Sequence, residues 1–219
     1  MSEHTIDLFG GTAPDTTHER LAPGAWLLRG FALGKALEIL AAAETVEAAA
    51  PFRHLVTPGG FRMSVAMTNC GSLGWVSDRR GYRYDSRDPL TGQPWPAMPP
   101  VFLELARSAA LASGFAGFEP DACLLNRYEP GARLTLHQDK DENDFSAPIV
   151  SVSLGVPVIF LFGGDARTDK QRRVPLQHGD VVVWGGPSRR RYHGVRAVQD
   201  GYHDSLGARR LNLTFRRAG

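Results

Sequence analysis

The spacing of apolar residues predicts two helices beside a series of short strands. In residues 31–49 apolar side chains recur every three or four positions, as on one face of a helix, and Pro51 ends the pattern. These positions are Leu33, Leu37, Leu40 and Ala43. A second helix begins at Pro99 and Pro100 and ends near Gly114. Its apolar side comprises Leu103, Ala106, Ala110 and Leu111. We expect the first helix to pack against the outside of a β core.

The second half of the chain alternates β-rich runs with turn residues, which predicts a core of short strands. The predicted strands are residues 122–128, 133–139, 149–154, 158–162, 180–184, 192–197 and 211–216. Such a series suits two facing antiparallel sheets, a jelly roll. We therefore predict a mainly β fold with flanking helices, in which residues 1–219 form a single domain and residues 120–219 form its jelly-roll core.

Two other segments differ from this core. Residues 1–24 are rich in Thr, Gly and Pro, so we expect an irregular N-terminal lead before a short strand at 26–28. In residues 52–99, a Pro-Gly-Gly turn at 58–60 precedes an alternating run at 61–69, which predicts a hairpin. Beyond it, aromatic and basic residues interleave on loops. That mixture is typical of surfaces that bind single-stranded nucleic acid, although the same rings equally suit the edge of a core.

Composition narrows the class of protein. With 219 residues, of which 42% are hydrophobic and 22% charged, the chain suits one large globular domain. Two cysteines are too few for a disulfide framework and fit a reducing compartment. We find no signal peptide and no run long enough to cross a bilayer, so we expect a soluble, cytoplasmic monomer without a membrane partner.

The net charge of +2 provides no general attraction to nucleic acid. The arginines are nevertheless uneven, with basic clusters at residues 79–87, 167–173 and 189–191. If the fold brings these clusters together, they form a local surface for phosphate groups. If it does not, they are solvated loops.

The motif His137-x-Asp139 sets an imidazole and a carboxylate side by side on one face of a strand. Alone, such a pair is more often a hydrogen-bonded strand end than a metal site. A second histidine would complete the two-His-one-carboxylate set that holds Fe(II) in non-haem oxygenases. Downstream, His178 lies at a turn and His203 in a Gly- and Ser-rich loop, whereas His193 lies in a predicted strand. We therefore predict His193 as the third metal ligand.

The last predicted strand carries a polar row. Alternation directs its apolar residues to one face and sends four polar residues to the other: Arg210, Asn212, Thr214 and Arg216. A row facing solvent would explain this pattern. So would a pocket in which guanidinium groups bind a dicarboxylate bidentately. Asn126 and Tyr128 lie two apart in an apolar strand, and they either donate to the same carboxylate or are satisfied by the backbone.

Together these residues resemble the AlkB family of Fe(II)- and 2-oxoglutarate-dependent nucleic-acid dealkylases, and in particular its bacterial members. The metal motif, His193 and the spacing Arg210-x-Asn212-x-x-x-Arg216 match the family pattern. Longer phrases match as well: TPGGFRMSVAMTNCG (57–71), PWPAMP (94–99), PDACLLNRYEPGA (120–132), LHQDKDE (136–142), PIVSVSLG (148–155) and HGDVVVWGG (178–186). The resemblance extends from about residue 21 to the C-terminus.

The resemblance implies a double-stranded β-helix, or jelly-roll, core with Fe(II) held by His137, Asp139 and His193. The residues that it implies for the cosubstrate 2-oxoglutarate are Asn126, Tyr128, Arg210, Asn212 and Arg216. Among them, Arg210 with the amide and phenol would hold the far carboxylate, and Arg216 would help at the near one. Asn212 would line the same cavity.

The resemblance also implies that residues 52–99 contain a nucleotide-recognition lid. In it, Trp75 would stack on the flipped damaged base and Tyr82 would contact its phosphate, while Asp141 would meet the exocyclic nitrogen of adenine or cytosine. The residues that the resemblance implies at the substrate are Trp75, Tyr82, Asp141, Arg167 and Met67.

The implied activity is oxidative dealkylation of bases such as 1-methyladenine and 3-methylcytosine in DNA, with single strands preferred and RNA as a second substrate. It would use Fe(II), O₂ and 2-oxoglutarate and release formaldehyde, succinate and CO₂. Three alternatives stay open from the residues themselves. They are a 2-oxoglutarate-dependent hydroxylase of a protein or small molecule, a non-catalytic jelly-roll module that holds a metal, and a zinc hydrolase, which this chain's lack of an HExxH motif disfavours.

Overall fold

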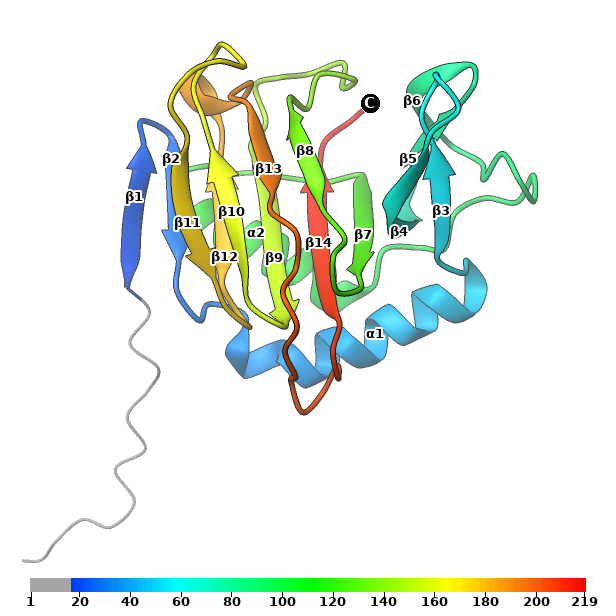
Figure 1. Cartoon of the computed structure of the whole chain (residues 1–219), viewed down its shortest axis with the longest axis horizontal. Coiled ribbons are helices and arrows are strands. Elements are labelled where there is room, and N and C mark those ends of the chain that lie inside the picture. The colour runs from blue at the N-terminus through cyan, green and yellow to red at the C-terminus, as the bar shows by residue number, and fades with distance from the viewer. Residues whose placement is uncertain (1–16) are drawn as a thin grey trace, which may run out of the picture.

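The computed structural model describes residues 17–219, which fold into two antiparallel sheets with two helices against the larger one (Figure 1). In spatial order the larger sheet contains β1 (His18–Ala22), β2 (Ala25–Leu28), β12 (Val181–Trp184), β9 (Ile149–Gly155), β14 (Arg210–Arg216), β7 (Ala122–Tyr128), β4 (Arg62–Gly71) and β3 (Arg53–Val56). The smaller sheet contains β11 (Arg172–Leu176), β10 (Val158–Phe162), β13 (His193–Val195) and β8 (Leu134–His137). A separate hairpin consists of β5 (Gly74–Asp78) and β6 (Gly81–Asp85). The predicted mainly β architecture is confirmed.

The apolar core has two parts, one on each side of the larger sheet. Between the sheets, Ile149 and Trp184 of the larger sheet pack with Phe160 of the smaller one. On the other side, the larger sheet packs against the helices through a cluster that includes Phe102 and Leu213. Removing this apolar surface from water is the main force that holds the layers together.

Strand β14 separates these two parts of the core by alternation. Its apolar residues Leu211, Leu213 and Phe215 join the helix side. All seven residues of the strand are buried, so the polar row that includes Arg210 and Arg216 faces the interior of the jelly roll. The interpretation in which this row faces solvent is therefore wrong.

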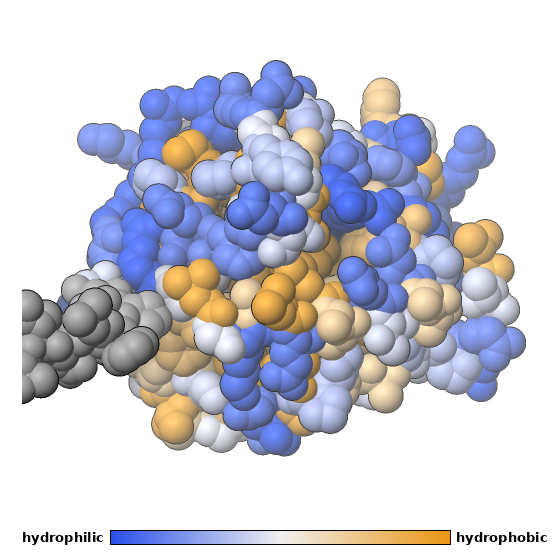
Figure 2. Space-filling view, turned by 90° about the horizontal axis from the view of Figure 1, so that it is seen from below, coloured by the Kyte–Doolittle hydropathy of each residue, from blue (hydrophilic) through white to orange (hydrophobic). Residues whose placement is uncertain are grey.

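The first helix buries a stripe that overlaps the predicted one in part, because Ala43 is buried and Leu40 packs against the core, whereas Leu33 and Leu37 are exposed. A 3-10 turn, η1 (Leu33–Lys35), leads into α1 (Ala36–Ala49). Leu37 is 76% exposed. Figure 2, a view of the molecule from below, shows apolar groups among hydrophilic ones on that face. The buried positions are Ala36, Ile39, Ala43 and Val46. An alanine-rich helix carries two overlapping apolar stripes, and the stripe with smaller residues allows the closer approach to the sheet.

The second helix, α2 (Pro100–Ala112), begins at the predicted proline. Gly114 follows its end with a φ of +86°, the left-handed conformation that glycine adopts at helix C-termini. Of its predicted apolar side, Ala106 and Ala110 are buried, whereas Leu111 is 64% exposed. Among the described residues, neither helix has the length and apolarity that a bilayer crossing requires.

Some local predictions need correction. Residues 18–22 of the expected irregular lead form strand β1, paired with β2, while residues 1–16 of that lead lie outside the described part of the chain. Strand β11 was not predicted, because its sequence RRVPL contains a proline. That proline is tolerated because β11 lies at the edge of its sheet. The expected division into a lid at 52–99 and a core at 120–219 stays a prediction, although β3 and β4 pair into the larger sheet.

Candidate active site

Three potential metal ligands converge where the smaller sheet ends. His137 is the last residue of β8 and lies opposite His193, the first residue of β13. Asp139 follows two residues after β8. One ligand atom from each of these residues lies within 4.8 Å of the others, the one such group of three or more found among residues 17–219. Each histidine Nε2 is 3.8 Å from Asp139 Oδ1. The structure thus brings together the trio that the sequence predicts.

Backbone carbonyl groups orient both imidazoles. The Nδ1 atom of His137 lies 2.8 Å from the carbonyl oxygen of Thr135, and that of His193 lies 3.0 Å from the carbonyl oxygen of Arg191. A carbonyl oxygen only accepts hydrogen bonds, so Nδ1 carries the proton and the Nε2 lone pair remains free for a cation. Burial, reinforced by the neighbouring His137, lowers the pKa of His193 to about 4, so this ring is neutral near pH 7.

Asp139 is held as a carboxylate by Arg216. Its Oδ2 atom accepts a 2.7 Å hydrogen bond from the Nε of Arg216, and the Nη2 of the same arginine is also 2.7 Å away. Although burial acts in the opposite direction, this guanidinium and the two imidazoles hold the pKa of Asp139 well below its usual range. Arg216 was expected at the near carboxylate of 2-oxoglutarate. That contact stays a prediction; the structure shows that Arg216 binds Oδ2 of Asp139 and leaves Oδ1 facing the histidines.

A second group of buried polar atoms lies in the same inter-sheet space. Arg210 is 2% exposed, and its Nη2 donates a 3.0 Å hydrogen bond to Ser153 Oγ. Its Nε and Nη1 have no hydrogen-bond partner among the described residues, and neither does the hydroxyl of Tyr128, which lies opposite Arg210 in the sheet. A buried guanidinium without a carboxylate partner is costly. A carboxylate would satisfy these donors, so the residues fit one end of a dicarboxylate.

The two asparagines of this region differ in their use. Asn126 Oδ1 is buried without a partner in residues 17–219, which leaves it open to a ligand. Asn212 donates 2.8 Å hydrogen bonds to Ser151 Oγ and to the Val152 carbonyl oxygen. Asn212 therefore braces β14 against β9 as well as lining the interior.

The β5–β6 hairpin presents an aromatic pair next to the metal ligands. Trp75 and Tyr82 are stacked with ring centroids 5.6 Å apart. Trp75 Nε1 donates a 2.9 Å hydrogen bond to Asp141 Oδ2, two residues beyond Asp139. The three predicted substrate residues Trp75, Tyr82 and Asp141 therefore lie together, at the edge of the metal cluster.

Two other predicted substrate residues lie elsewhere. Arg167 is exposed on the loop between β10 and β11. Met67 is 3% exposed and packs in the inter-sheet core. Its side chain is almost wholly buried, and its expected contact with a substrate stays a prediction.

Sequence reasoning missed a buried acidic residue that joins the lid to the metal site. Glu142 accepts a 2.7 Å hydrogen bond from the hydroxyl of Tyr84, whose pKa is raised by burial. Glu142 also pairs with Arg189 at 3.2 Å and with Arg216 at 3.4 Å. The run of charged residues after Asp139 gave no signal of which carboxylate points inward, because strand periodicity ends there.

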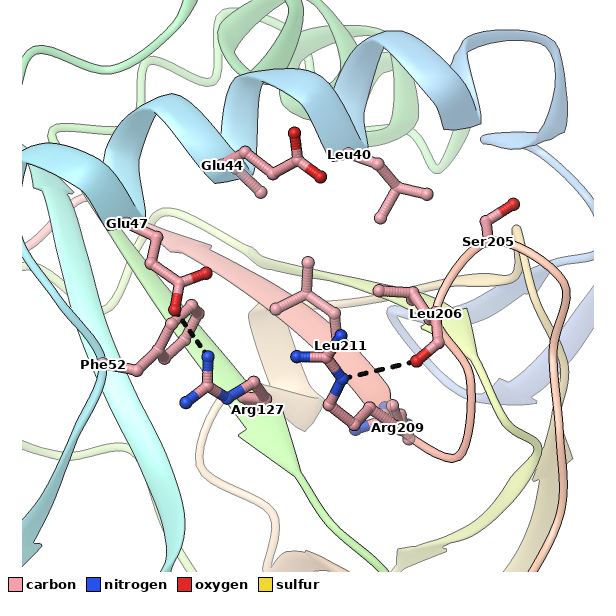
Figure 3. A pocket seen from close by; sticks show the side chains of 11 residues that line it. Leu40, Glu44, Glu47, Phe52, Arg127, Ser205, Leu206, Arg209 and Leu211 are labelled. Atoms are coloured by element: carbon pink, nitrogen blue, oxygen red, sulfur yellow. Dashed lines mark hydrogen bonds and ion pairs between the residues drawn. The ribbon is translucent and has the colours of Figure 1, made fainter.

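A small cavity lies under α1, and Arg210 is the one lining residue that it shares with the polar group described above. It is lined by residues of α1 and by Phe52, Arg127, Leu206 and Leu211 among others, and Figure 3 shows these side chains between the helix and the sheet. Leu211 belongs to the apolar alternation of β14, which faces the helices. The cavity therefore lies on the opposite side of the larger sheet from the metal ligands.

Comparison with known proteins agrees with this geometry. The model of the 2OG-Fe(II) oxygenase superfamily matches residues 24–216. The chain is 58% identical to the alpha-ketoglutarate-dependent dioxygenase AlkB of Salmonella typhimurium over 97% of this chain and 98% of that protein. It is 55% identical to AlkB of Escherichia coli, over 98% of both chains. The chain belongs to the AlkB family.

The solved structure of OsALKBH1 superposes with a TM-score of 0.81 at 30% identity, covering 92% of this chain and 100% of that one. The AlkB relatives and the superfamily match identify the chain as an Fe(II)- and 2-oxoglutarate-dependent dioxygenase that uses O₂. The predicted family, fold, enzyme class and cofactors are confirmed. The zinc hydrolase and the non-catalytic module are thereby excluded.

Proposed function

We propose that this AlkB-family enzyme removes alkyl groups oxidatively from ring nitrogens of damaged bases, such as 1-methyladenine and 3-methylcytosine. The observation that carries the proposal is the hydrogen bond between Trp75 and Asp141, which sets an aromatic ring and a carboxylate beside the metal ligands. A more distant relative, ALKBH1 of Mus musculus, is named a nucleic acid dioxygenase, which supports a nucleic-acid substrate.

In this proposal, His137, Asp139 and His193 hold Fe(II) through the two Nε2 atoms and Oδ1. The unpaired donors of Arg210 and Tyr128 hold the far carboxylate of 2-oxoglutarate. When bound, the metal and cosubstrate supply the oxidation of an N-methyl group to a hydroxymethyl group, with succinate and CO₂ as coproducts. The hydroxymethyl amine then releases formaldehyde and the repaired base.

The lid residues suit lesions that carry a positive charge. A base methylated at a pairing nitrogen carries a positive charge and pairs poorly, which lowers the cost of flipping it out of the stack. Asp141 attracts that charge, and Trp75 adds a cation–π interaction. Tyr82, which is 46% exposed, and Arg167 are available to contact phosphate groups.

Single-stranded DNA is the proposed substrate, with RNA second, because a strand without a partner loses no base pairs when the base is flipped. We further propose that the enzyme acts as a monomer in the cytoplasm. The free thiols of Cys70 and Cys123, both buried, are consistent with a reducing compartment.

The test is incubation of the full chain with Fe(II), 2-oxoglutarate and a single-stranded oligonucleotide that carries one 3-methylcytosine. We expect formaldehyde and the unmodified oligonucleotide in equal amounts. Asp139→Asn should abolish both, whereas the matched control Asp204→Asn, at an exposed position outside the site, should retain both. If succinate forms but no lesion in a panel of methylated DNA and RNA yields formaldehyde, the proposal is wrong and a protein or small-molecule hydroxylase is indicated.

A further inference from the structure

We propose that Phe145 and Arg190 form a second nucleotide site, which binds the nucleotide adjacent to the target base on the same strand. This inference rests on the proposed function and extends it by assigning where the flanking strand is held. The ligand class is a single-stranded nucleotide unit, with its base on the Phe145 ring and its phosphate at Arg190.

The two residues form a compact aromatic and cationic surface. Phe145 is one of eight large hydrophobic residues exposed among residues 17–219, at 36%. The guanidinium carbons of Arg189 and Arg190 lie 5.4 and 5.7 Å from the centre of its ring. Their environments differ, because the Arg189 side chain is 3% exposed whereas Arg190 is exposed. One guanidinium therefore supports the ring from within, and the other is free to meet a ligand.

Hydrogen bonds tie this surface to the metal site. Gln138, between the ligands His137 and Asp139, donates a 2.6 Å hydrogen bond to the carbonyl oxygen of Arg190. Arg189 Nη1 donates a 3.1 Å hydrogen bond to the carbonyl oxygen of Asp139. Because both bonds involve the segment that carries the metal ligands, Arg189 and Arg190 are held at a fixed position relative to those ligands.

The recognition lid contacts the same segment from its own direction. Trp75 reaches Asp141, and Tyr84 reaches Glu142, which also pairs with Arg189. The segment after Asp139 is thus bridged to the lid and to the Phe145 surface. In the proposed complex, a strand whose target base enters at the lid passes its neighbouring nucleotide over this second surface.

The charges favour a phosphate as the occupant. Arg190 has no carboxylate partner within 4.0 Å among residues 17–219. Its neighbour Arg191 is committed elsewhere, because it lies over the Phe162 ring and donates to the Gly163 carbonyl oxygen. An exposed ring beside an unpaired guanidinium is the combination that binds single strands without sequence preference, since every base has a π-face and every linkage a phosphate.

A simpler role for Phe145 is to cover Arg189, for which any large apolar side chain suffices. The variant Phe145→Leu separates these roles, because leucine keeps the cover and loses the stacking surface. Phe145→Trp keeps both. Matched controls are Tyr202→Leu, which removes a ring that is 75% exposed in the β13–β14 connection, and Arg196→Gln, which removes an exposed charge.

The experiment measures kcat/KM for formaldehyde release from two substrates, 3-methylcytidine monophosphate and a single-stranded nonamer with one central 3-methylcytosine. For Phe145→Leu we expect the ratio of nonamer to mononucleotide to fall about 10-fold, within the range that loss of one stacked base produces. Phe145→Trp and both controls should keep the wild-type ratio. Arg190→Gln should reduce the salt dependence of nonamer binding by about one phosphate contact, a slope change of about 0.7.

An unchanged ratio for Phe145→Leu, or equal losses on both substrates, would overturn the inference and leave Phe145 as a cover for Arg189. Failure of the proposed function is distinguishable, because then neither substrate yields formaldehyde with the wild-type enzyme. In that case fluorescence anisotropy with a labelled, unmodified nonamer still tests the surface. Equal affinity of the wild type and Phe145→Leu would overturn it.

Discussion

Arg216 places two of its nitrogens, Nε and Nη2, 2.7 Å from one oxygen of Asp139. Because that oxygen, Oδ2, is occupied by the guanidinium, only Oδ1 points toward the two imidazoles. Each histidine Nε2 is 3.8 Å from Oδ1. Arg216 therefore favours the charged form of the carboxylate and also determines which of its oxygens faces the metal site.

Replacing Arg216 should weaken metal binding. In Arg216→Gln the carboxylate of Asp139 loses its cation and its orientation, and loss of such a supporting contact typically lowers metal affinity about 10- to 100-fold. Anaerobic titration with Co(II) at pH 7 measures this affinity. Arg217→Gln, at a neighbouring side chain that is 51% exposed, is the control. A folded Arg216→Gln protein with wild-type affinity would contradict the prediction.

Replacing Arg210 should have opposite effects on the free and the ligand-bound protein. Arg210→Met removes a buried guanidinium with two unpaired nitrogens, so the thermal midpoint of the ligand-free protein should be retained or raised. With Mn(II) replacing iron, 2-oxoglutarate at 100 times its Kd should stabilise the wild type by about 2.7 kcal/mol. Arg210→Met should gain no stabilisation from 2-oxoglutarate at the same concentration. The control Arg209→Met should be stabilised as much as the wild type. A wild-type shift in Arg210→Met would place the cosubstrate elsewhere.

Two variants of Trp75 should separate the ring from its hydrogen bond to Asp141. Trp75→Ala removes both, and we expect kcat/KM on a 3-methylcytosine oligonucleotide to fall about 10- to 100-fold, the usual loss for one aromatic–base stack. Trp75→Phe keeps a ring, so the fall should be several-fold smaller. Equal losses for the two variants would assign the effect to the hydrogen bond.

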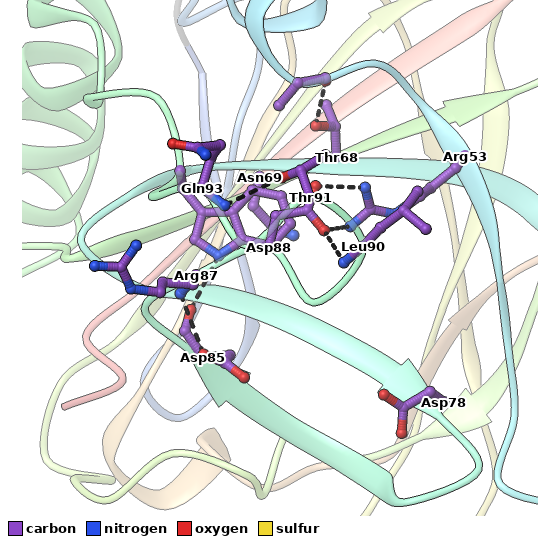
Figure 4. Close-up of polar contacts among 12 residues, drawn as sticks. Arg53, Thr68, Asn69, Asp78, Asp85, Arg87, Asp88, Leu90, Thr91 and Gln93 are labelled. Carbon is purple, nitrogen blue, oxygen red and sulfur yellow. Dashed lines mark hydrogen bonds and ion pairs between the residues drawn. The ribbon is translucent and has the colours of Figure 1, made fainter.

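Protonation of Asp88 should make part of the free energy of unfolding depend on pH. Its carboxylate is 4% exposed and receives hydrogen bonds of 2.6 and 2.5 Å from Arg53, with another from the Leu90 amide (Figure 4). Although burial acts in the opposite direction, these donors lower its pKa. The stabilisation is therefore complete above the unfolded pKa of about 4 and is lost as the pH falls through the lower folded value.

Asp88→Asn should accordingly cost about 2 kcal/mol at pH 7, as expected for a hydrogen bond to a charged group. The difference from the wild type should shrink below about pH 4. Urea unfolding at several pH values measures it, with exposed Asp200→Asn as the control. A difference that stays constant down to pH 3 would contradict the assigned protonation.

The metal ligands could be predicted because the pattern is local. His137 and Asp139 are separated by one residue, and His193 was selected since it was the downstream histidine in a predicted strand. The polar row of β14 was equally visible, because alternation along a strand needs no knowledge of its partners.

Contacts between residues that are distant in the sequence could not be predicted from such local patterns. The pairing of Arg216 with Asp139 joins positions 77 residues apart, and the burial of Glu142 follows the end of β8, where periodicity no longer reports on direction. The buried stripe of α1 was predicted only in part, because the sheet selects the stripe that contains Ala43 and leaves Leu37 outside. In each case, which side chain is buried depends on the element that packs against it, and the local sequence does not identify that element.

The carbonyl groups of residues 135 and 191 hold the two imidazoles ready before any cation arrives. The rings therefore lose their rotational freedom when the protein folds, so metal binding carries no further entropy cost for ordering them. Protein stripped by a chelator should consequently reload on simple mixing in the cold, with no refolding step and without a helper protein to reshape the ligands.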